Sequence, residues 1–301
     1  MGRSMRMAWK NLAAGLLAAV AVSCGAHADT QSIASGGRER SFIVHRPANL
    51  DRAKPVPLVV MLHGGFGTGS DAEKSYHWDD EADGNGFVVV YPDGAFWSWN
   101  AGSNCCGWAQ SRHVDDLAFL TQLIEKLVHD ENIDSRRVYL TGMSNGAAMA
   151  YRYACEGTFP VAAIGVVSGS LAFSCSNPRA LPVMEIHGLA DQFIPYAGGH
   201  GTRAASDVAW LGVDATLGAF RKADNCPAAA PQKNGVVETT TWRCSAGREV
   251  VLITIADAGH QWPGALRRTG LFATLVKLDP PSQALDATQV LWSFFARHSA
   301  D

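Results

Sequence analysis

A serine flanked by glycines is the residue of this chain best suited to nucleophilic chemistry. Gly142, Ser144 and Gly146 form a G-x-S-x-G pattern. The preceding residues 138–141 are strand-like, and residues 147–154 predict a helix. A strand, a sharp turn and a helix form the setting in which such a serine projects its hydroxyl from the edge of a sheet. The alternative is a glycine-rich turn with an inert serine.

A serine nucleophile needs a general base, and the order of residues along the chain narrows the choice of histidine. When the serine lies on a strand–turn–helix, the acid and then the histidine follow it in the sequence. The histidines that follow Ser144 are His187, His200, His260 and His298. His260 lies between the last predicted strand and the last predicted helix, where a loop can bring it back to the serine. We therefore expect His260 to be the base, and the alternative is a loop histidine without a role.

The base needs an acid that fixes its tautomer and stabilises the imidazolium. Asp191 closes the sequence His-Gly-Leu-Ala-Asp, which follows the predicted strand 183–186 and so places the carboxylate at the carboxyl edge of the sheet. Glu185 lies inside that strand. Asp257 is only three residues before His260, which is too close to support the far nitrogen of the ring comfortably. Asp191 is our candidate acid, and Asp257 is the fallback.

Acyl transfer also requires N–H donors for the oxyanion of the tetrahedral intermediate. The residue after the nucleophile, Asn145, is expected to supply one backbone N–H. His63-Gly64-Gly65 follows the predicted strand 58–62, where a second donor loop occurs in this arrangement. The amide of Gly65 or Phe66 is the candidate second donor, although these glycines would also serve simply to turn the chain.

The elements that must position these residues alternate between strand and helix signals, which favours an α/β fold with a mostly parallel sheet covered on both faces. The apolar segments that predict strands are 41–46 (an edge strand), 58–62, 87–91, 138–141, 162–167, 183–186, 236–243 and 250–255. The segments that predict helices are 116–129, 147–154, 213–223 and 286–298. The least regular stretches are 95–113, 196–206 and 263–281. Loops of that length are often functional.

Length and composition limit the class of protein. The chain has 301 residues, 47% of them hydrophobic and 18% charged, which is ordinary for a folded domain and disfavours intrinsic disorder. The formal net charge is −3 and there is no long basic run, so we expect no nucleic-acid partner. An α/β domain of this size often stands alone, and we expect a single catalytic domain over residues 29–301.

The first 28 residues have the three parts of a secretory signal. Arg3, Arg6 and Lys10 precede the apolar run 12–22, and Ala26-His27-Ala28 gives a small-x-small cleavage pattern. We therefore expect a secreted or periplasmic protein, with cleavage after Ala28. Lipidation of Cys24 is the alternative. The apolar run is too short to span a bilayer, and no later stretch is long and apolar enough to do so.

Six cysteines remain if the leader is removed, and an even number in an exported protein predicts up to three disulfides. Cys226 and Cys244 could close a hairpin-like loop, and Cys155 and Cys175 flank one predicted strand. Cys105 and Cys106 would then be left as a vicinal pair, unless they exchange with the others. Neither CxxC nor HxxxH accompanies Cys105-Cys106, so we expect no metal site.

Eight motifs in one order resemble the secreted polyhydroxybutyrate depolymerase and feruloyl esterase family of α/β hydrolases, similar to carbohydrate esterase family 1. They are Leu62-His63-Gly64-Gly65, Tyr91-Pro92-Asp93-Gly94, Trp99-Asn100-Ala101-Gly102, Cys105-Cys106-Gly107, Val114-Asp115-Asp116, Gly142-Met143-Ser144-Asn145-Gly146, His187-Gly188-Leu189-Ala190-Asp191 and Gly259-His260-Gln261-Trp262-Pro263-Gly264. The resemblance runs from about Ser41 to the C-terminus and implies the triad Ser144, Asp191 and His260. The stretch 264–281 departs from the pattern by its length, so the resemblance does not identify the substrate.

The expected chemistry is acyl transfer through Ser144 to water, without a metal or organic cofactor. The substrate would be a polyester oligomer or polymer or a plant-cell-wall phenolic ester. Trp97, Trp99 and Trp262 are candidates for an aromatic cleft, with core packing as the alternative. Asp115 and Asp116 precede an apolar helix, where we expect capping and solvation rather than catalysis.

Three other functions remain open at this point. The same triad could serve an acyltransferase or an acetyl-xylan-type esterase. The chain could instead be an exported binding protein with a vestigial triad, which the complete set of three residues argues against.

Overall fold

A computed structural model describes residues 29–51, 53–103, 105–204, 207–267 and 278–300, and ten strands within them form one sheet. In spatial order these are β1 (Asp29–Ser35), β2 (Arg38–His45), β4 (Val88–Pro92), β3 (Val56–Leu62), β5 (Ile133–Met143), β6 (Ala163–Val167), β7 (Val183–Gly188), β12 (Glu249–Ile255), β11 (Val237–Arg243) and β10 (Gln232–Asn234). A separate two-stranded sheet contains β8 (Gly199–His200) and β9 (Ala209–Trp210).

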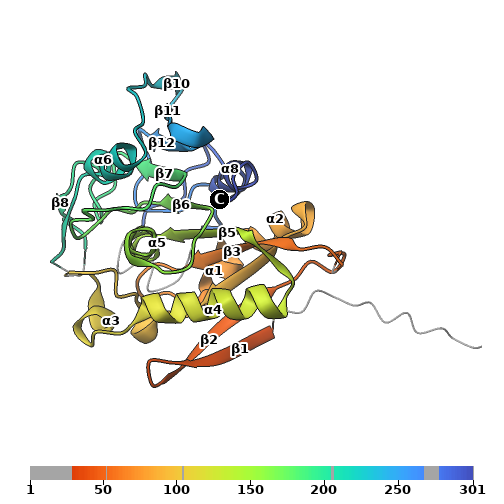
Figure 1. Ribbon diagram of the computed structural model, residues 1–301. Coiled ribbons are helices and arrows are strands. Elements are labelled where there is room, and N and C mark those ends of the chain that lie inside the picture. The colour runs from red at the N-terminus through yellow and green to blue at the C-terminus, as the bar shows by residue number, and fades with distance from the viewer. Residues whose placement is uncertain (1–28, 52, 104, 205–206, 268–277, 301) are drawn as a thin grey trace, which may run out of the picture.

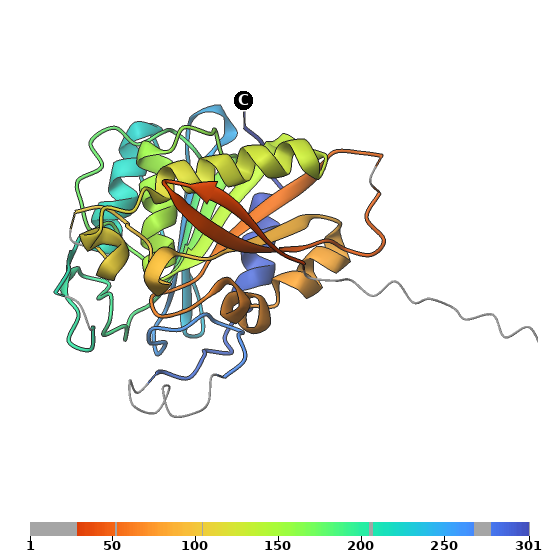
Figure 2. The same cartoon turned by 90° about the horizontal axis from the view of Figure 1, so that it is seen from below.

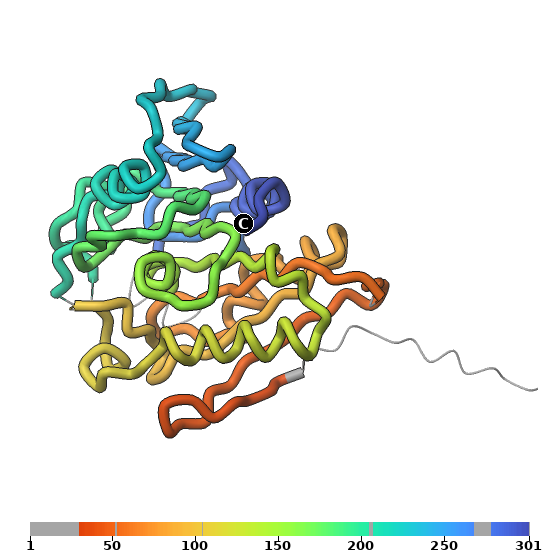
Figure 3. Tube along the Cα trace, viewed as in Figure 1, coloured from red at the N-terminus to blue at the C-terminus, as the bar shows by residue number. Residues whose placement is uncertain are grey.

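The strands from β4 to β12 run parallel, and the outer strands at both ends of the sheet run antiparallel. Figure 3 shows these antiparallel ends as the β1–β2 hairpin in red and the β10–β11 hairpin in blue. The prediction of a mostly parallel sheet is confirmed. Because parallel strands end at the same edge, the loops after β3, β5, β7 and β12 all reach one edge of the sheet.

Helices cover both faces of the sheet (Figure 1). One face carries α4 (Asp116–Asp130), α5 (Asn145–Glu156) and α6 (Val213–Ala223), and the other carries α1 (Gly69–Ser75), α2 (Trp78–Asn85) and α8 (Ala287–Phe295). The other helices among the described residues are α3 (Gly107–Ser111) and the short 3-10 turns η1 (Ala95–Trp97) and η2 (Ser245–Gly247). All residues of β3 are buried, with Leu58 and Val60 packed toward one helix layer and Val59 toward the other.

The edge prediction for residues 41–46 is wrong. β2 pairs on its outer side with β1, which forms the edge and lies alongside α4 (Figure 2). The sequence of β1, DTQSIAS, is largely polar and gives little hydrophobic signal. The short helices α1, α2 and α3 were also not predicted. α1 is capped by Thr68, whose side chain accepts from the backbone N–H of Asp71 in a capping box. Such short polar helices lack a clear apolar period.

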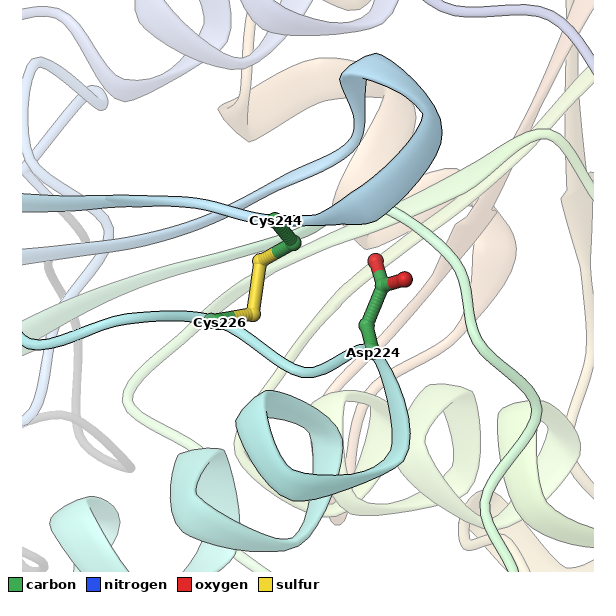
Figure 4. A group of neighbouring side chains, drawn as sticks. All are labelled: Asp224, Cys226 and Cys244. Atoms are coloured by element: carbon green, nitrogen blue, oxygen red, sulfur yellow. A yellow bond between two sulfur atoms is a disulfide. The ribbon is translucent and has the colours of Figure 1, made fainter.

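The six described cysteines form three disulfides: Cys105–Cys106, Cys155–Cys175 and Cys226–Cys244. Asp224 lies beside the last of these, and Figure 4 shows both sulfur atoms joined to each other. The carboxylate of Asp224 accepts hydrogen bonds from the Arg248 guanidinium at 2.7–3.0 Å. This cluster is therefore a disulfide beside an ion pair, and its sulfur atoms are not available to a metal ion.

The expected leader 1–28, with its possible lipidation site Cys24, lies outside the described residues. Within the described part of the chain, no helix combines the length and the apolar character needed to cross a bilayer.

Candidate active site

Ser144 lies at a sharp turn between β5 and α5. Its φ of 57° and ψ of −121° are unusual for a residue with a side chain, and its N–H donates to the Val167 carbonyl at 3.1 Å. The turn is tight because Gly146 has no side chain: a Cβ there would collide with the carbonyl oxygen of Leu62 and lie 2.5 Å from that of His63. The nucleophile turn thus presses directly against the end of β3.

The three predicted triad residues lie in one hydrogen-bonded chain. His260 Nε2 is 2.8 Å from Ser144 Oγ, and His260 Nδ1 is 2.7 Å from Asp191 Oδ2. The other carboxylate oxygen of Asp191 accepts from the backbone N–H groups of Phe193 and Ile194 at 2.8 and 2.9 Å. These bonds orient both the acid and the ring. The fallback acid, Asp257, is exposed on the loop before His260.

The environment of Asp191 favours its ionised form. Burial alone would raise its pKa, but the charge and hydrogen bond of His260, the charge of His187 and the Ile194 amide together hold its pKa below the usual value. An ionised carboxylate at Nδ1 requires that nitrogen to carry the proton. In the neutral ring, Nε2 is then the nitrogen without a proton, and it faces Ser144 in the arrangement of a general base.

The loop after β3 lies against the nucleophile turn, as its sequence predicted. A Cβ on Gly64 would meet Ser144 Cβ at 3.5 Å, and one on Gly65 would meet Asn145 Cβ at 3.9 Å. The N–H of Phe66, however, donates to the Trp97 carbonyl at 2.8 Å. Phe66 is therefore wrong as an oxyanion donor, and the backbone amides of Asn145, at the first residue of α5, and Gly65 are left as the candidates.

The sequence comparison decides the family of the chain. A family model described as "Esterase PHB depolymerase" matches residues 41–241. The chain belongs to this family. Over 233 residues it is 28% identical to the bifunctional acetylxylan esterase/xylanase of Neocallimastix patriciarum, an alignment that covers 74% of this chain and 31% of that protein. Over 233 residues it is 25% identical to feruloyl esterase B of Piromyces equi, covering 73% of this chain and 42% of that protein.

The chain thus spans less than half the length of each of these two relatives. Among solved structures, esterase 2 of Thermogutta terrifontis phosphorylated by paraoxon aligns with a TM-score of 0.58 and 13% identity, covering 90% of this chain and 94% of that chain. That likeness concerns the fold, which is the α/β-hydrolase fold predicted from the sequence motifs.

Two of the three tryptophans predicted for a substrate cleft are core residues in this family member. Trp99 is 0% exposed, and its backbone N–H and carbonyl hold the side-chain amide of Asn145 at 2.7 and 3.0 Å. Trp262 is 1% exposed, stacks on Tyr76 at 4.6 Å and donates from Nε1 to Thr288. Both predictions as substrate contacts are wrong, because these rings fill the interior and anchor loops.

Trp97 is the tryptophan of the three that faces solvent, with 64% of its surface exposed. Its carbonyl binds the Phe66 amide, and Phe66 is itself 69% exposed. Trp108, 62% exposed, lies 6.1 Å from the Phe96 ring. Beside the donor loop lies a set of four aromatic side chains, which we call the aromatic rim: Phe66, Phe96, Trp97 and Trp108.

Asp115 and Asp116 differ in their roles. Asp115 caps α4, as predicted, by accepting from the Ala118 N–H at 3.0 Å. Asp116 is fully buried, so the expectation of solvation is wrong for it. Its carboxylate binds Arg40 at 2.7 Å and the Asn100 N–H at 2.8 Å, which ties the loop after η1 to β2. A partner far along the chain, invisible in the local sequence, explains the burial.

A group of side chains around His260 was not predicted from the sequence. The Phe193 ring stacks on the His260 ring at 4.9 Å, and the Arg203 guanidinium lies over Phe193 at 4.8 Å. Arg203 pairs with Asp279 at 2.7 Å, and Asp279 accepts the His260 backbone N–H at 3.0 Å. Asp279 comes close because Gly259 has no side chain. The irregular stretches 196–206 and 263–281 indicated that these loops could be functional. Their sequences did not indicate which residues they contact.

His63 also contributes to the site without touching the serine. Its Nε2 accepts from the Gly94 N–H at 2.9 Å, and its Nδ1 faces the Gly64 carbonyl at 2.7 Å, so Nδ1 carries the proton and the ring is neutral. The pKa of His63 is lowered from its usual value, chiefly because the ring is buried. The carbonyl of His63 accepts from Trp99 Nε1 at 2.9 Å. His63 therefore holds the donor loop in place.

Proposed function

We propose that this chain is a serine carboxylic-ester hydrolase that works through an acyl-enzyme. The observation that carries the proposal is the chain of hydrogen bonds Ser144–His260–Asp191, at 2.8 and 2.7 Å, next to the candidate donor amides of Asn145 and Gly65. A serine, an unprotonated imidazole nitrogen and an ionised carboxylate in this order are what acyl transfer requires. Membership of the esterase PHB depolymerase family supports the same chemistry.

In the proposed reaction Ser144 Oγ attacks the ester carbonyl carbon while His260 Nε2 accepts the hydroxyl proton. The carbonyl oxygen becomes an oxyanion that the amides of Asn145 and Gly65 bind, aided by the positive end of the α5 dipole. The intermediate collapses as His260 gives the proton to the leaving alcohol. Water, deprotonated by His260, then attacks the acyl carbon, and the carboxylic acid leaves as Ser144 regains its proton. All the catalytic groups in these steps are supplied by residues of the chain.

The substrate class we propose is a hydroxyalkanoate oligomer or polymer ester or a feruloyl-type ester. The aromatic rim beside the donor loop supports a phenolic or apolar acyl chain, because exposed aromatic rings offer large contact areas to such groups. The relatives named acetylxylan esterase/xylanase and feruloyl esterase B support an ester of plant cell-wall material. Acetyl-xylan-type substrates are the alternative within the same chemistry.

We also propose that the chain is exported and that residues 29–301 form the catalytic domain after removal of residues 1–28. Three disulfides support an oxidising compartment, since such bonds persist mainly there. Intact-mass measurement of the mature protein from a secreting host tests the cleavage after Ala28. An added lipid mass at Cys24 would replace this proposal with a membrane-anchored one.

The test of function is a parallel hydrolysis panel of methyl ferulate, acetylated xylan, hydroxybutyrate oligomers and short p-nitrophenyl esters. We expect turnover of at least one class and its loss in Ser144→Ala, together with labelling of Ser144 by a fluorophosphonate probe. Faster formation of a transferred ester than of free acid, with an added alcohol, would identify an acyltransferase. A wild-type protein that neither turns over an ester nor reacts with the probe would refute the enzyme and leave a binding protein.

A further inference from the structure

A buried cluster of titratable groups lies directly behind Asp191, and the proposed reaction does not use it. Glu185 and His187 on β7 and Tyr151 on α5 have 0% exposed surface. His187 Nδ1 is 2.8 Å from Glu185 Oε1, and its Nε2 is 2.9 Å from the Ile194 carbonyl oxygen. The same Nε2 is 3.7 Å from Asp191 Oδ2. Burying ionisable groups is costly, so their arrangement calls for a physical explanation.

The hydrogen-bond partners fix where the protons are. A carbonyl oxygen can only accept, so Nε2 of His187 carries a proton. Glu185 accepts from the Tyr151 hydroxyl at 2.8 Å and from the Gly169 N–H at 3.1 Å, in addition to facing Nδ1 of His187. Burial raises the pKa of Glu185 above its usual value, but the hydrogen bonds from His187, Tyr151 and Gly169 and the charge of His187 oppose burial and favour the ionised form. The proton between Glu185 and His187 therefore lies on Nδ1, and both ring nitrogens are protonated.

We propose that His187 is a charged imidazolium at neutral pH and a positioning residue for Asp191, which keeps His260 in its neutral, proton-accepting form at lower pH. This inference rests on the proposed function. The Asp191 carboxylate lies between two imidazoles, with His260 Nδ1 at 2.7 Å and His187 Nε2 at 3.7 Å from the same oxygen. His187 influences Ser144 indirectly, through Asp191 and His260.

The groups that face His187 come from several elements. Glu185 is on the same strand, Asp191 and Ile194 are on the loop that follows, and the Tyr196 ring lies edge-on at 6.0 Å. Tyr151 on α5 acts through Glu185. Burial alone would lower the pKa of His187, but the hydrogen bond and charge of Glu185, followed by the charge of Asp191, raise it. One cation thus lies between two carboxylates.

The effect on catalysis follows from sharing the charge of Asp191. A carboxylate that already faces one cation stabilises a second imidazolium less well. Asp191 therefore stabilises an imidazolium at His260 less than an isolated aspartate would. Because a general base must be unprotonated to accept the serine proton, activity extends to lower pH when His187 is charged.

The first experiment replaces the pair without leaving a lone buried charge. Glu185→Gln with His187→Gln removes both charges and keeps polar side chains in the cluster. We expect the acid limb of the profile of kcat/KM against pH to move to higher pH by about half a pH unit to one pH unit. Tyr196→Phe, which leaves the ring beside His187, is the matched control and is expected to keep the wild-type limb. A folded double variant with the wild-type limb would overturn the proposal.

A second measurement does not depend on the double variant folding. Nitrogen-15 NMR of imidazole-labelled wild-type protein reports the protonation of each histidine ring, with His187 assigned by through-bond correlation. We expect both nitrogens of His187 to be protonated at neutral pH, and a neutral His187 there would overturn the inference. The measurement needs no substrate. A lack of ester turnover by the wild type would instead refute the proposed function, so the two failures are distinguishable.

Discussion

The backbone N–H of His260 donates to the carboxylate of Asp279 at 3.0 Å, although 19 residues separate them. Asp279 also pairs with Arg203, whose guanidinium lies over the Phe193 ring that stacks on His260. Two loops are thereby joined around the ring that has to accept the serine proton. The relationship concerns the backbone of the proposed base, whereas Asp191 orients its side chain.

Removing this support should slow turnover. We expect Asp279→Ala to lower kcat by about tenfold, because a small displacement of a catalytic group weakens the reacting geometry. Asp279→Asn keeps an acceptor for the His260 N–H but loses the charge pair with Arg203, so its loss should be smaller. Steady-state kcat and KM on a soluble ester measure both. Asp257→Ala is the control, because Asp257 is an exposed acidic residue on the loop that leads to His260. Equal losses in Asp257→Ala and Asp279→Ala would contradict the assignment.

The close approach at the nucleophile turn predicts a large cost for one methyl group. In Gly146→Ala the new Cβ would meet the carbonyl oxygens of Leu62 and His63, so we expect destabilisation of about 3 kcal/mol or more. Gly84→Ala in α2 meets no atom within 4 Å and should stabilise the protein by about 0.5–1 kcal/mol through helix propensity. Denaturant unfolding of the two variants checks this, and similar free energies of unfolding would contradict it.

The disulfide Cys155–Cys175 joins the end of α5 to the segment after β6, with a sequence separation of 20 residues. Removing it as Cys155→Ala with Cys175→Ala should lower the free energy of unfolding by about 3 kcal/mol, chiefly by freeing the unfolded chain. Denaturant unfolding under oxidising conditions gives the difference. Under strong reducing conditions the wild type and the variant should converge, and a difference that persists there would require another cause.

Glu249 is expected to stabilise the protein near the end of the C-terminal helix α8 by an amount that depends on pH. Hydrogen bonds from His298, and then from Arg297, hold the pKa of Glu249 at about 2 instead of 4.5, although burial opposes them. Because the folded pKa is lower than the unfolded one, the stabilisation is complete above about pH 4.5 and is lost as the pH falls toward 2. After allowance for solvent screening, we expect about 1 kcal/mol.

Glu249→Gln should therefore lose about 1 kcal/mol of unfolding free energy at neutral pH, and its difference from the wild type should shrink below the unfolded pKa. Urea unfolding across the acid range measures this. Glu125→Gln, which removes an exposed carboxylate on α4, is the matched control. A constant difference between Glu249→Gln and the wild type over the whole range would exclude the pKa as its origin.

The local sequence was sufficient for the nucleophile turn, and chain order was sufficient for His260 and Asp191, because each follows a strand that ends at one edge of the sheet. It was insufficient wherever a role depends on a distant partner. Trp262 is next but one to His260, yet Tyr76 and Thr288 draw it into the core. The Phe66 amide is occupied by Trp97, which no spacing rule reveals.

The same limit applies to charge. Asp116 could be recognised as a residue near a helix start, but not as a buried partner of Arg40. The pair Arg203 and Asp279 joins two irregular stretches whose separation along the chain hides their contact. Sequence patterns therefore predicted the residues within one strand–loop unit, whereas contacts between loops required the three-dimensional structure.

The exposure of the aromatic rim has a consequence for the stability of the fold. Trp97 and Trp108 present nearly two thirds of their surface to solvent, so replacing either ring removes little buried area. Surface substitutions of this kind usually change the free energy of unfolding by less than about 0.5 kcal/mol. The serine, its base and its acid are held by the interior. Residues of the aromatic rim can therefore be exchanged with little effect on the stability of the fold or on the arrangement of Ser144, His260 and Asp191.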